Sequence, residues 1–140
     1  MKLAHRFSHR HLPVFFFCLF AGAACAGESK VSLSGDQEVP PVVTSASGSG
    51  SFFVSEAKAV SGSVTTTGVT GSMAHIHHAA TGKNGPVVVP LLKSGDNSWV
   101  VPAGAALTDE QYTAYKAGEL YVNVHSQNHP GGEIRAQIKP

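Results

Sequence analysis

The sequence predicts an all-β domain, an antiparallel β-sandwich or Greek-key barrel of the immunoglobulin-like or superoxide-dismutase-like kind. Three observations predict it. The chain after residue 26 is rich in Gly, Val, Ser and Thr, its apolar residues alternate with polar ones, and turn-forming residues divide it into short segments. Alternation with a period of two places successive side chains on opposite faces of a strand. Many short strands separated by turns are typical of sandwiches and barrels.

Eight segments have the alternation and the composition expected of strands. They are residues 30–34, 50–55, 60–67, 72–78, 87–92, 99–101, 120–125 and 133–139. Gly, Pro, Asn and Asp are concentrated in the gaps between them, which marks those gaps as turns.

One segment, residues 109–117, predicts a short helix. Thr108 and Gln111 have the spacing of a capping box, in which the threonine hydroxyl accepts the backbone N–H of the residue three positions later and that residue's side chain reaches back. Gly118 provides a left-handed stop at the other end. We therefore expect one helix of about two turns, directly before the strand at residues 120–125.

The first 26 residues have the pattern of an export signal. Basic residues precede a short apolar run, and small residues lead to Ala26. This order is typical of a secretory signal peptide. We expect a signal peptide over residues 1–26 and a single domain over residues 27–140, secreted or periplasmic. Lipid anchoring at Cys25 is a less favoured alternative, because Gly22 stands where a leucine or valine is usual.

The composition of the predicted domain limits its partners. Without the three basic residues of the signal, 114 residues remain, with seven Lys and Arg against nine Asp and Glu, so the formal net charge is −2. Domains that bind nucleic acid present clustered positive charge, which argues against such a partner. No further apolar stretch is long enough to span a membrane. Both cysteines lie in the signal, so the domain folds on its hydrophobic core alone.

The histidines are the most informative residues. All five that follow residue 26 fall in two segments, AHIHH at residues 74–78 and NVHSQNH at residues 123–129. On a strand, His75 and His77 point to the face opposite their apolar neighbours. We expect the two rings to project together from the outer, solvated face, with α-carbons ~7 Å apart.

Alternation along residues 120–125 places His125 on an outer face as well. If the two strands are neighbours, His75, His77 and His125 form a three-histidine site, with His129 or His78 as a fourth donor. Three imidazoles and an open position suit copper(II) or zinc, whereas calcium needs oxygen ligands. Binding requires neutral imidazole, so metal affinity should fall below pH ~6.5.

Other interpretations of the same residues stay open. Histidines on solvated strand faces are common, so the pattern is compatible with no metal at all. The imidazoles can also hydrogen-bond to loop carbonyls and hold the long loop at residues 79–86. Glu133 and Arg135 share a face, which predicts a surface ion pair. No G-x-S-x-G motif occurs, so the sequence does not predict a hydrolase of the α/β type.

Five segments resemble the CHRD domain, first described in chordin and widespread in exported bacterial proteins. They are residues 35–41 (GDQEVPP), 74–77 (AHIH), 82–87 (GKNGPV), 120–125 (LYVNVH) and 131–138 (GGEIRAQI). The match runs from about Lys30 to the C-terminus, with Ala136 where the family commonly has glycine. The resemblance implies a compact β-sandwich or barrel and carries no settled biochemical activity.

A fainter resemblance is to the copper–zinc superoxide dismutase barrel. There an H-x-H strand and a later V-H strand supply copper ligands, and a Gly-rich turn leads to an arginine beside the metal. His75, His77, His125 and Arg135 occupy matching places. The zinc-loop ligands, the bridging histidine and the disulfide have no counterpart. The resemblance therefore implies a copper site without dismutase activity.

We accordingly predict an exported, soluble, non-enzymatic domain that binds copper, or zinc, through His75, His77, His125 and His129. The alternative is a non-catalytic adhesion or interaction module, in which the same face contacts a protein or glycan partner and no metal is bound. A redox enzyme that uses the open coordination position is the least favoured hypothesis.

Overall fold

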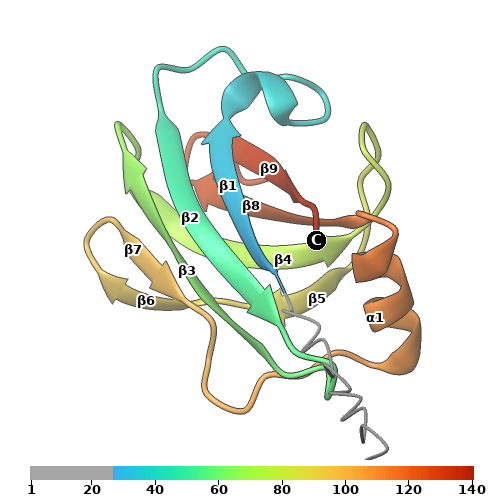
Figure 1. The fold of residues 1–140 in the computed structure, drawn as a ribbon. Helices are drawn as coiled ribbons and strands as arrows, with labels where there is room; N and C mark the ends of the chain where they lie inside the picture. Colours follow the sequence, from blue (N-terminus) through green and yellow to red (C-terminus); the bar gives the residue numbers. More distant parts are fainter. Residues whose placement is uncertain (1–26) are drawn as a thin grey trace, which may run out of the picture.

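The computed structural model describes residues 27–140 (Figure 1), so the predicted signal peptide lies outside the described residues. The elements follow in the order β1 (Glu28–Ser34), a 3-10 helix η1 (Gly35–Gln37), β2 (Ser47–Val54), β3 (Val60–Thr67), β4 (Gly71–His78), β5 (Val87–Pro90), β6 (Leu92–Gly95), β7 (Ser98–Val100), α1 (Asp109–Lys116), β8 (Leu120–Ser126) and β9 (Ile134–Ile138).

The nine strands form one sheet in which every paired neighbour is antiparallel, in the order β5-β4-β8-β9-β1-β2-β3-β7-β6. The two edge strands, β5 and β6, are consecutive in the chain and separated only by Leu91. The Leu91 N–H donates to the Ala74 carbonyl of β4 at 2.9 Å. The sheet therefore curls round on itself into a near-barrel (Figure 1), which confirms the predicted all-β fold.

Alternating side chains build the core. Along β1, Ser29, Val31 and Leu33 are buried while the residues between them are exposed. The interior is filled by apolar side chains from every part of the sheet, among them Phe52, Val64, Ile76, Trp99, Val122, Val124, Ile134 and Ile138. Full burial of one such side chain contributes ~1.5–3 kcal/mol to folding, so this core is the main favourable term in the stability of the domain.

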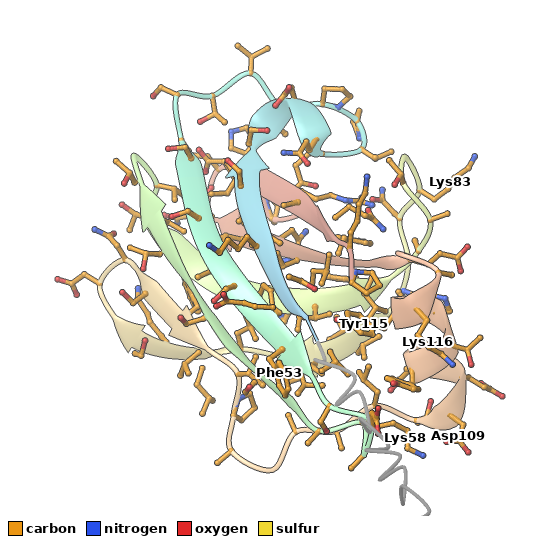
Figure 2. The ribbon with its side chains drawn as sticks, viewed as in Figure 1. Phe53, Lys58, Lys83, Asp109, Tyr115 and Lys116 are labelled. Carbon is orange, nitrogen blue, oxygen red and sulfur yellow. The ribbon has the colours of Figure 1, made fainter. Side chains whose placement is uncertain are left out.

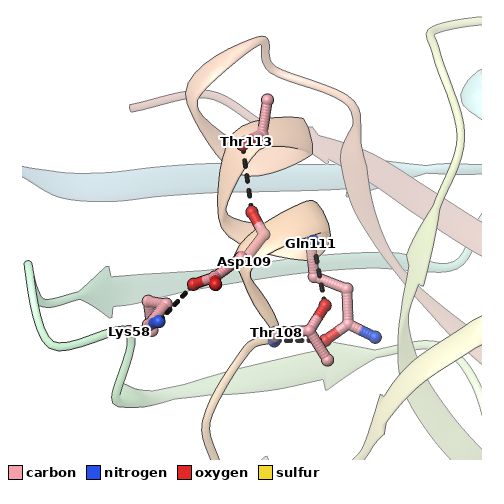
Figure 3. A network of polar contacts seen from close by, with 5 residues as sticks. All are labelled: Lys58, Thr108, Asp109, Gln111 and Thr113. Carbon is pink, nitrogen blue, oxygen red and sulfur yellow. Dashed lines mark hydrogen bonds and ion pairs between the residues drawn. The ribbon is translucent and has the colours of Figure 1, made fainter.

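Helix α1 confirms the predicted helix and its cap. Thr108 Oγ1 accepts the Gln111 N–H at 3.2 Å, and Gln111 Oε1 accepts the Thr108 N–H at 2.9 Å (Figure 3). Gly118 follows with φ of +73°, a left-handed conformation that glycine adopts without strain. Tyr115, labelled in Figure 2, lies 3.2 Å from Ser29 Oγ through its hydroxyl, which ties the helix to β1.

The predicted strand at residues 87–92 is in fact two strands, β5 and β6. The chain turns at Leu91, whose side chain is buried in the core. Pro90 precedes the turn and has no N–H to continue the ladder of hydrogen bonds. The 3-10 helix η1 was not predicted either.

Strand β8 is buried along its whole length. One face carries Leu120, Val122 and Val124 into the core. The other face, which carries Tyr121, Asn123 and His125, is covered by the loops at residues 79–86 and 127–133. A strand buried on both faces is unusual in an antiparallel sheet, where one face normally contacts water. It identifies the outer side of β8 as a second, polar interior.

Candidate metal centre

Strands β4 and β8 are neighbours, and their register brings the predicted histidines together. His77 lies opposite Tyr121, and His75 lies opposite Asn123, two residues from His125. The potential ligand nitrogens of His75, His77 and His125 all lie within 4.8 Å of one another. We call these three residues the histidine cluster. Their convergence follows from strand alternation and one antiparallel pairing.

The cluster is not on a solvated face, contrary to our expectation. His77 is 8% exposed and His125 is 6% exposed, while His75 is half-buried. The two loops over β8 exclude water from the inner part of the cluster. A ligand held there is consequently bound in a partly desolvated setting, in which electrostatic interactions are stronger than in water.

Loop carbonyls fix the orientation of two of the rings. The His77 Nδ1–H donates to the Gly85 carbonyl at 3.0 Å, and the His125 Nδ1–H donates to the Pro130 carbonyl at 2.9 Å. The interpretation that imidazoles hold the loop at residues 79–86 is thus confirmed for His77. Each of these bonds places the ring proton on Nδ1 and leaves the Nε2 lone pair free, as carbonyl partners of metal-binding histidines do.

The His75 and His125 rings are hydrogen-bonded to each other, whereas one nitrogen of His77 has no partner. His125 Nε2 lies 3.0 Å from His75 Nδ1, and because His125 Nε2 carries no proton, His75 is the donor. His77 Nε2 is buried and has no hydrogen-bond partner. The Asn123 amide lies near the His77 ring and favours its charged form, but it makes no hydrogen bond of normal geometry with Nε2. A buried nitrogen without a partner costs ~1–3 kcal/mol.

All three rings favour the neutral state. Burial lowers the pKa of His75, and the neighbouring rings of His125 and His77 lower it further. Burial also lowers the pKa of His77 and of His125, against the opposing effect of the Gly85 and Pro130 carbonyls. Since the ordinary value is 6.5, the three imidazoles are neutral at pH 7 and able to bind a cation.

A stack of planar groups supports His77. The His77 and Tyr121 rings are parallel within 4°, with centroids 4.8 Å apart, and the Arg135 guanidinium lies over the Tyr121 ring, 3.3 Å from its centroid. Arg135 is 2% exposed and donates to the Lys83 carbonyl at 2.7 Å and to Asn84 Oδ1 at 3.1 Å. Cation–π contacts of desolvated groups are worth ~2 kcal/mol. The stack and the loop therefore hold the His77 ring from two sides.

The predicted surface pair of Glu133 and Arg135 is wrong. Arg135 is buried and bonds to the loop at residues 79–86, whereas Glu133 accepts a hydrogen bond from Thr44 Oγ1 at 2.8 Å. Glu133 lies just before β9, which begins at Ile134. Its side chain therefore does not follow the alternation of the strand that carries Arg135.

One polar group beside the cluster was missed by the sequence analysis. Glu38 is 4% exposed, and burial raises its pKa to about 7 against the opposing charge of Arg135. Its Oε1 and Asn123 Nδ2 lie against Gly132, where a β-carbon would be 2.4 Å and 2.6 Å from them. The only signal in the sequence was the place of Glu38 within GDQEVPP.

Two other histidines lie apart from the cluster. His129 is on the turn after β8, where its backbone N–H donates to Ser126 Oγ, and it is not among the atoms within 4.8 Å. His78 is at the end of β4 with the opposite alternation, and its Nε2 lies 3.9 Å from Glu119 Oε2. The structure therefore brings together three of the four predicted metal ligands, and a role for His129 stays a prediction.

Fold and site define a class: an antiparallel β near-barrel with a partly buried histidine cluster under two loops. A family model described as the CHRD domain matches residues 29–138, so the chain belongs to the CHRD domain family. The resemblance to the CHRD domain found in the sequence is thereby confirmed. No curated protein and no solved structure matches the chain. Within residues 27–140, no helix is both long enough and apolar enough to cross a membrane.

Proposed function

We propose that this CHRD domain binds one transition-metal ion, copper, through His75, His77 and His125. The observation that carries the proposal is the His77 side chain. Its buried Nε2 has no hydrogen-bond partner, and one of its ring nitrogens lies within 4.8 Å of a ring nitrogen of each of the two other residues. An ion at this point gives Nε2 the partner it lacks. Three imidazoles are a donor set typical of copper and zinc centres.

The surroundings support a metal more than an incidental grouping. Two of the three rings have their second nitrogen bonded to a backbone carbonyl, which is the usual outer shell of a metal-binding histidine. Three of the four buried side-chain atoms without a partner in the described part of the chain belong to this region, on Glu38, His77 and Asn123. Buried polar groups are nearly always paired, so such a grouping points to a ligand.

The proposed role is to hold copper outside the cytoplasm in an exported protein, without catalysis. Export is supported by the signal-like pattern of residues 1–26. Binding without turnover is supported by the cover over the cluster, because loops bonded to His77 and His125 restrict the approach of a substrate. We prefer copper to zinc because His75, His77, His125 and Arg135 follow one another along the chain in the same order as the copper ligands and the arginine of the copper–zinc superoxide dismutase barrel.

Metal titration of the full chain tests the proposal. We expect one Cu(II) per chain with Kd tighter than ~10 μM, about −6.8 kcal/mol. His75→Ala, His77→Ala and His125→Ala should each weaken binding by more than the ~10–100-fold typical of losing an outer-shell partner. His78→Ala is the matched control on the same strand and should bind as wild type. His129→Ala tests the predicted accessory ligand.

One observation favours a second candidate function. The bonds from His77 and His125 hold two loops in place, which is also what an interaction module needs to present a surface to a protein or glycan. The metal-binding proposal would be removed if wild type bound neither copper nor zinc more tightly than ~10 μM while His77→Ala and His125→Ala were still folded. The interaction module would then be the remaining candidate.

A further inference from the structure

A fourth side chain with metal-binding chemistry lies beside the histidine cluster. Met73 is the one methionine among residues 27–140, and its side chain is 48% exposed. Methionine is usually a core residue that fills irregular gaps. Here the one methionine of the described chain is instead on the surface, on the strand that carries His75 and His77.

The register places Met73 at the edge of the cluster. Ala74 and Ile76 are buried in the core, so Met73 shares the opposite face with His75 and His77. Across the sheet, Met73 is the direct partner of His125. Side chains directly opposite in an antiparallel pair have β-carbons ~4.5–5.5 Å apart, and residues two apart on one strand are ~7 Å apart. The register therefore places Met73 next to His75 along β4 and opposite His125 on β8.

A β-bulge fixes this end of β4. The pairing with β8 shifts between Gly71 and Met73, and the Ser72 hydroxyl donates to the His125 carbonyl at 3.2 Å. Bulges recur beside functional sites, where they redirect a side chain. The Gly85 and Pro130 carbonyls accept hydrogen bonds from the Nδ1 atoms of His77 and His125, so the loops cover the Nδ1 side of these two rings. Met73 and His75 share one face of β4, two residues apart, and Met73 is exposed while His75 is half-buried.

We propose that Met73 Sδ is a fourth ligand of the copper centre and that the completed site binds Cu(I) as well as Cu(II). The inference rests on the proposed function of the cluster and adds the oxidation state of the copper ion that it binds. Thioether sulfur is a soft donor that selects Cu(I), whereas zinc prefers imidazole, thiolate and carboxylate. The unbranched side chain has three rotatable bonds and can swing its sulfur onto an ion held by the rings.

The test compares Cu(I) and Cu(II) affinity of the full chain, wild type against Met73→Leu, with Cu(I) measured anaerobically against a competing chelator. Leucine keeps the size of an exposed apolar side chain, so the variant should fold as wild type. We expect Met73→Leu to weaken Cu(I) by at least ~10-fold, the lower end of what losing an outer-shell partner costs, and to change Cu(II) by less. Phe53→Leu is the control, because Phe53, labelled in Figure 2, is an exposed apolar residue on β2, and β9 and β1 lie between β2 and β8 in the sheet.

X-ray absorption of the Cu(I)-loaded protein gives a second readout, with copper–sulfur scattering in wild type that Met73→Leu lacks. Equal Cu(I) affinities, or a spectrum with nitrogen neighbours alone, would overturn the assignment of Met73 and leave the three-histidine site intact. Wild type that binds Cu(II) but no Cu(I) would also overturn it. Wild type that binds neither ion would remove the proposed function itself.

Discussion

Replacing Gly85 with alanine disturbs the histidine cluster without removing a ligand. A β-carbon at Gly85 would lie 1.8 Å from the His78 carbonyl oxygen, so the backbone of the loop must move. Gly85 accepts from His77 Nδ1 at 3.0 Å and donates its N–H to the Tyr121 hydroxyl at 3.3 Å. Moving the loop breaks both contacts and frees the His77 ring to change its orientation and the position of its proton.

The size of the effect follows from those two contacts. Loss of two hydrogen bonds at ~1 kcal/mol each lowers the free energy of unfolding by ~2 kcal/mol, which is about 8 °C in Tm for a domain of this length. Loss of an outer-shell carbonyl lowers metal affinity ~10–100-fold. We therefore expect Gly85→Ala to melt earlier and also to bind copper more weakly.

Calorimetric melting and copper titration of the same sample check both effects. Gly131→Ala is the matched control in the opposite loop, because a β-carbon there meets nothing within 4 Å and its φ is not in the left-handed region. It should change neither Tm nor affinity. A Gly85→Ala protein that melts earlier but binds copper as tightly as wild type would refute the idea that the Gly85 carbonyl orients His77 for a metal.

Three further predictions concern the cluster, its neighbour and the helix. Copper at 100 times its Kd should stabilise wild type by ~2.7 kcal/mol and raise Tm by about 10 °C; a rise of the same size in His77→Ala would contradict the site. Burial raises the pKa of Glu38 from its ordinary 4.5 to about 7, so the folded state keeps a proton that the unfolded state loses. Stability relative to Glu38→Gln should therefore fall as pH rises from about 4.5 to about 7, by at most ~1.4 kcal/mol per pH unit, and stay level above; urea unfolding that shows a constant difference would refute this. Thr108→Ala should lower the free energy of unfolding by ~1 kcal/mol through loss of the capping box. Asp109→Asn is the control, because the Asp109 side chain forms only an exposed ion pair with Lys58 (Figure 3), and it should leave Tm unchanged. Equal decreases of Tm in the two variants would argue against the cap.

The parts of the fold that were predictable depend on short-range rules. Alternation put His75 and His77 on one face and His125 on a matching face, and the observed pairing of β4 with β8 then sufficed to bring them together. The spacing of Thr108 and Gln111 predicted the helix start because a capping box involves only four consecutive residues. Local patterns of this kind do not depend on the rest of the chain.

The parts that were not predictable depend on where loops come to rest. The loop at Gly85 covers His77, and the turn at Pro130 covers His125. No periodic pattern in the sequence marks either contact. Glu38, which follows η1, lies beside Asn123 of β8 and Gly132 although these residues are far from it in the sequence. Lys83 illustrates the same point, since its backbone carbonyl binds Arg135 while its side chain points away from the sheet (Figure 2).

The break at Leu91 is a further case. Residues 87–92 have the composition of one continuous strand, but closing a curved sheet requires the chain to pass from one edge to the other at this point. That requirement comes from the whole sheet and not from the segment itself.

The most direct test of a three-histidine copper centre is to count the imidazole nitrogens on Cu(II) bound to the full chain by pulsed electron paramagnetic resonance. Wild type should show three imidazoles, His77→Ala should show two, and the control His78→Ala should show three. A count of one or none in wild type, or a count that His77→Ala leaves unchanged, would contradict the centre formed by His75, His77 and His125.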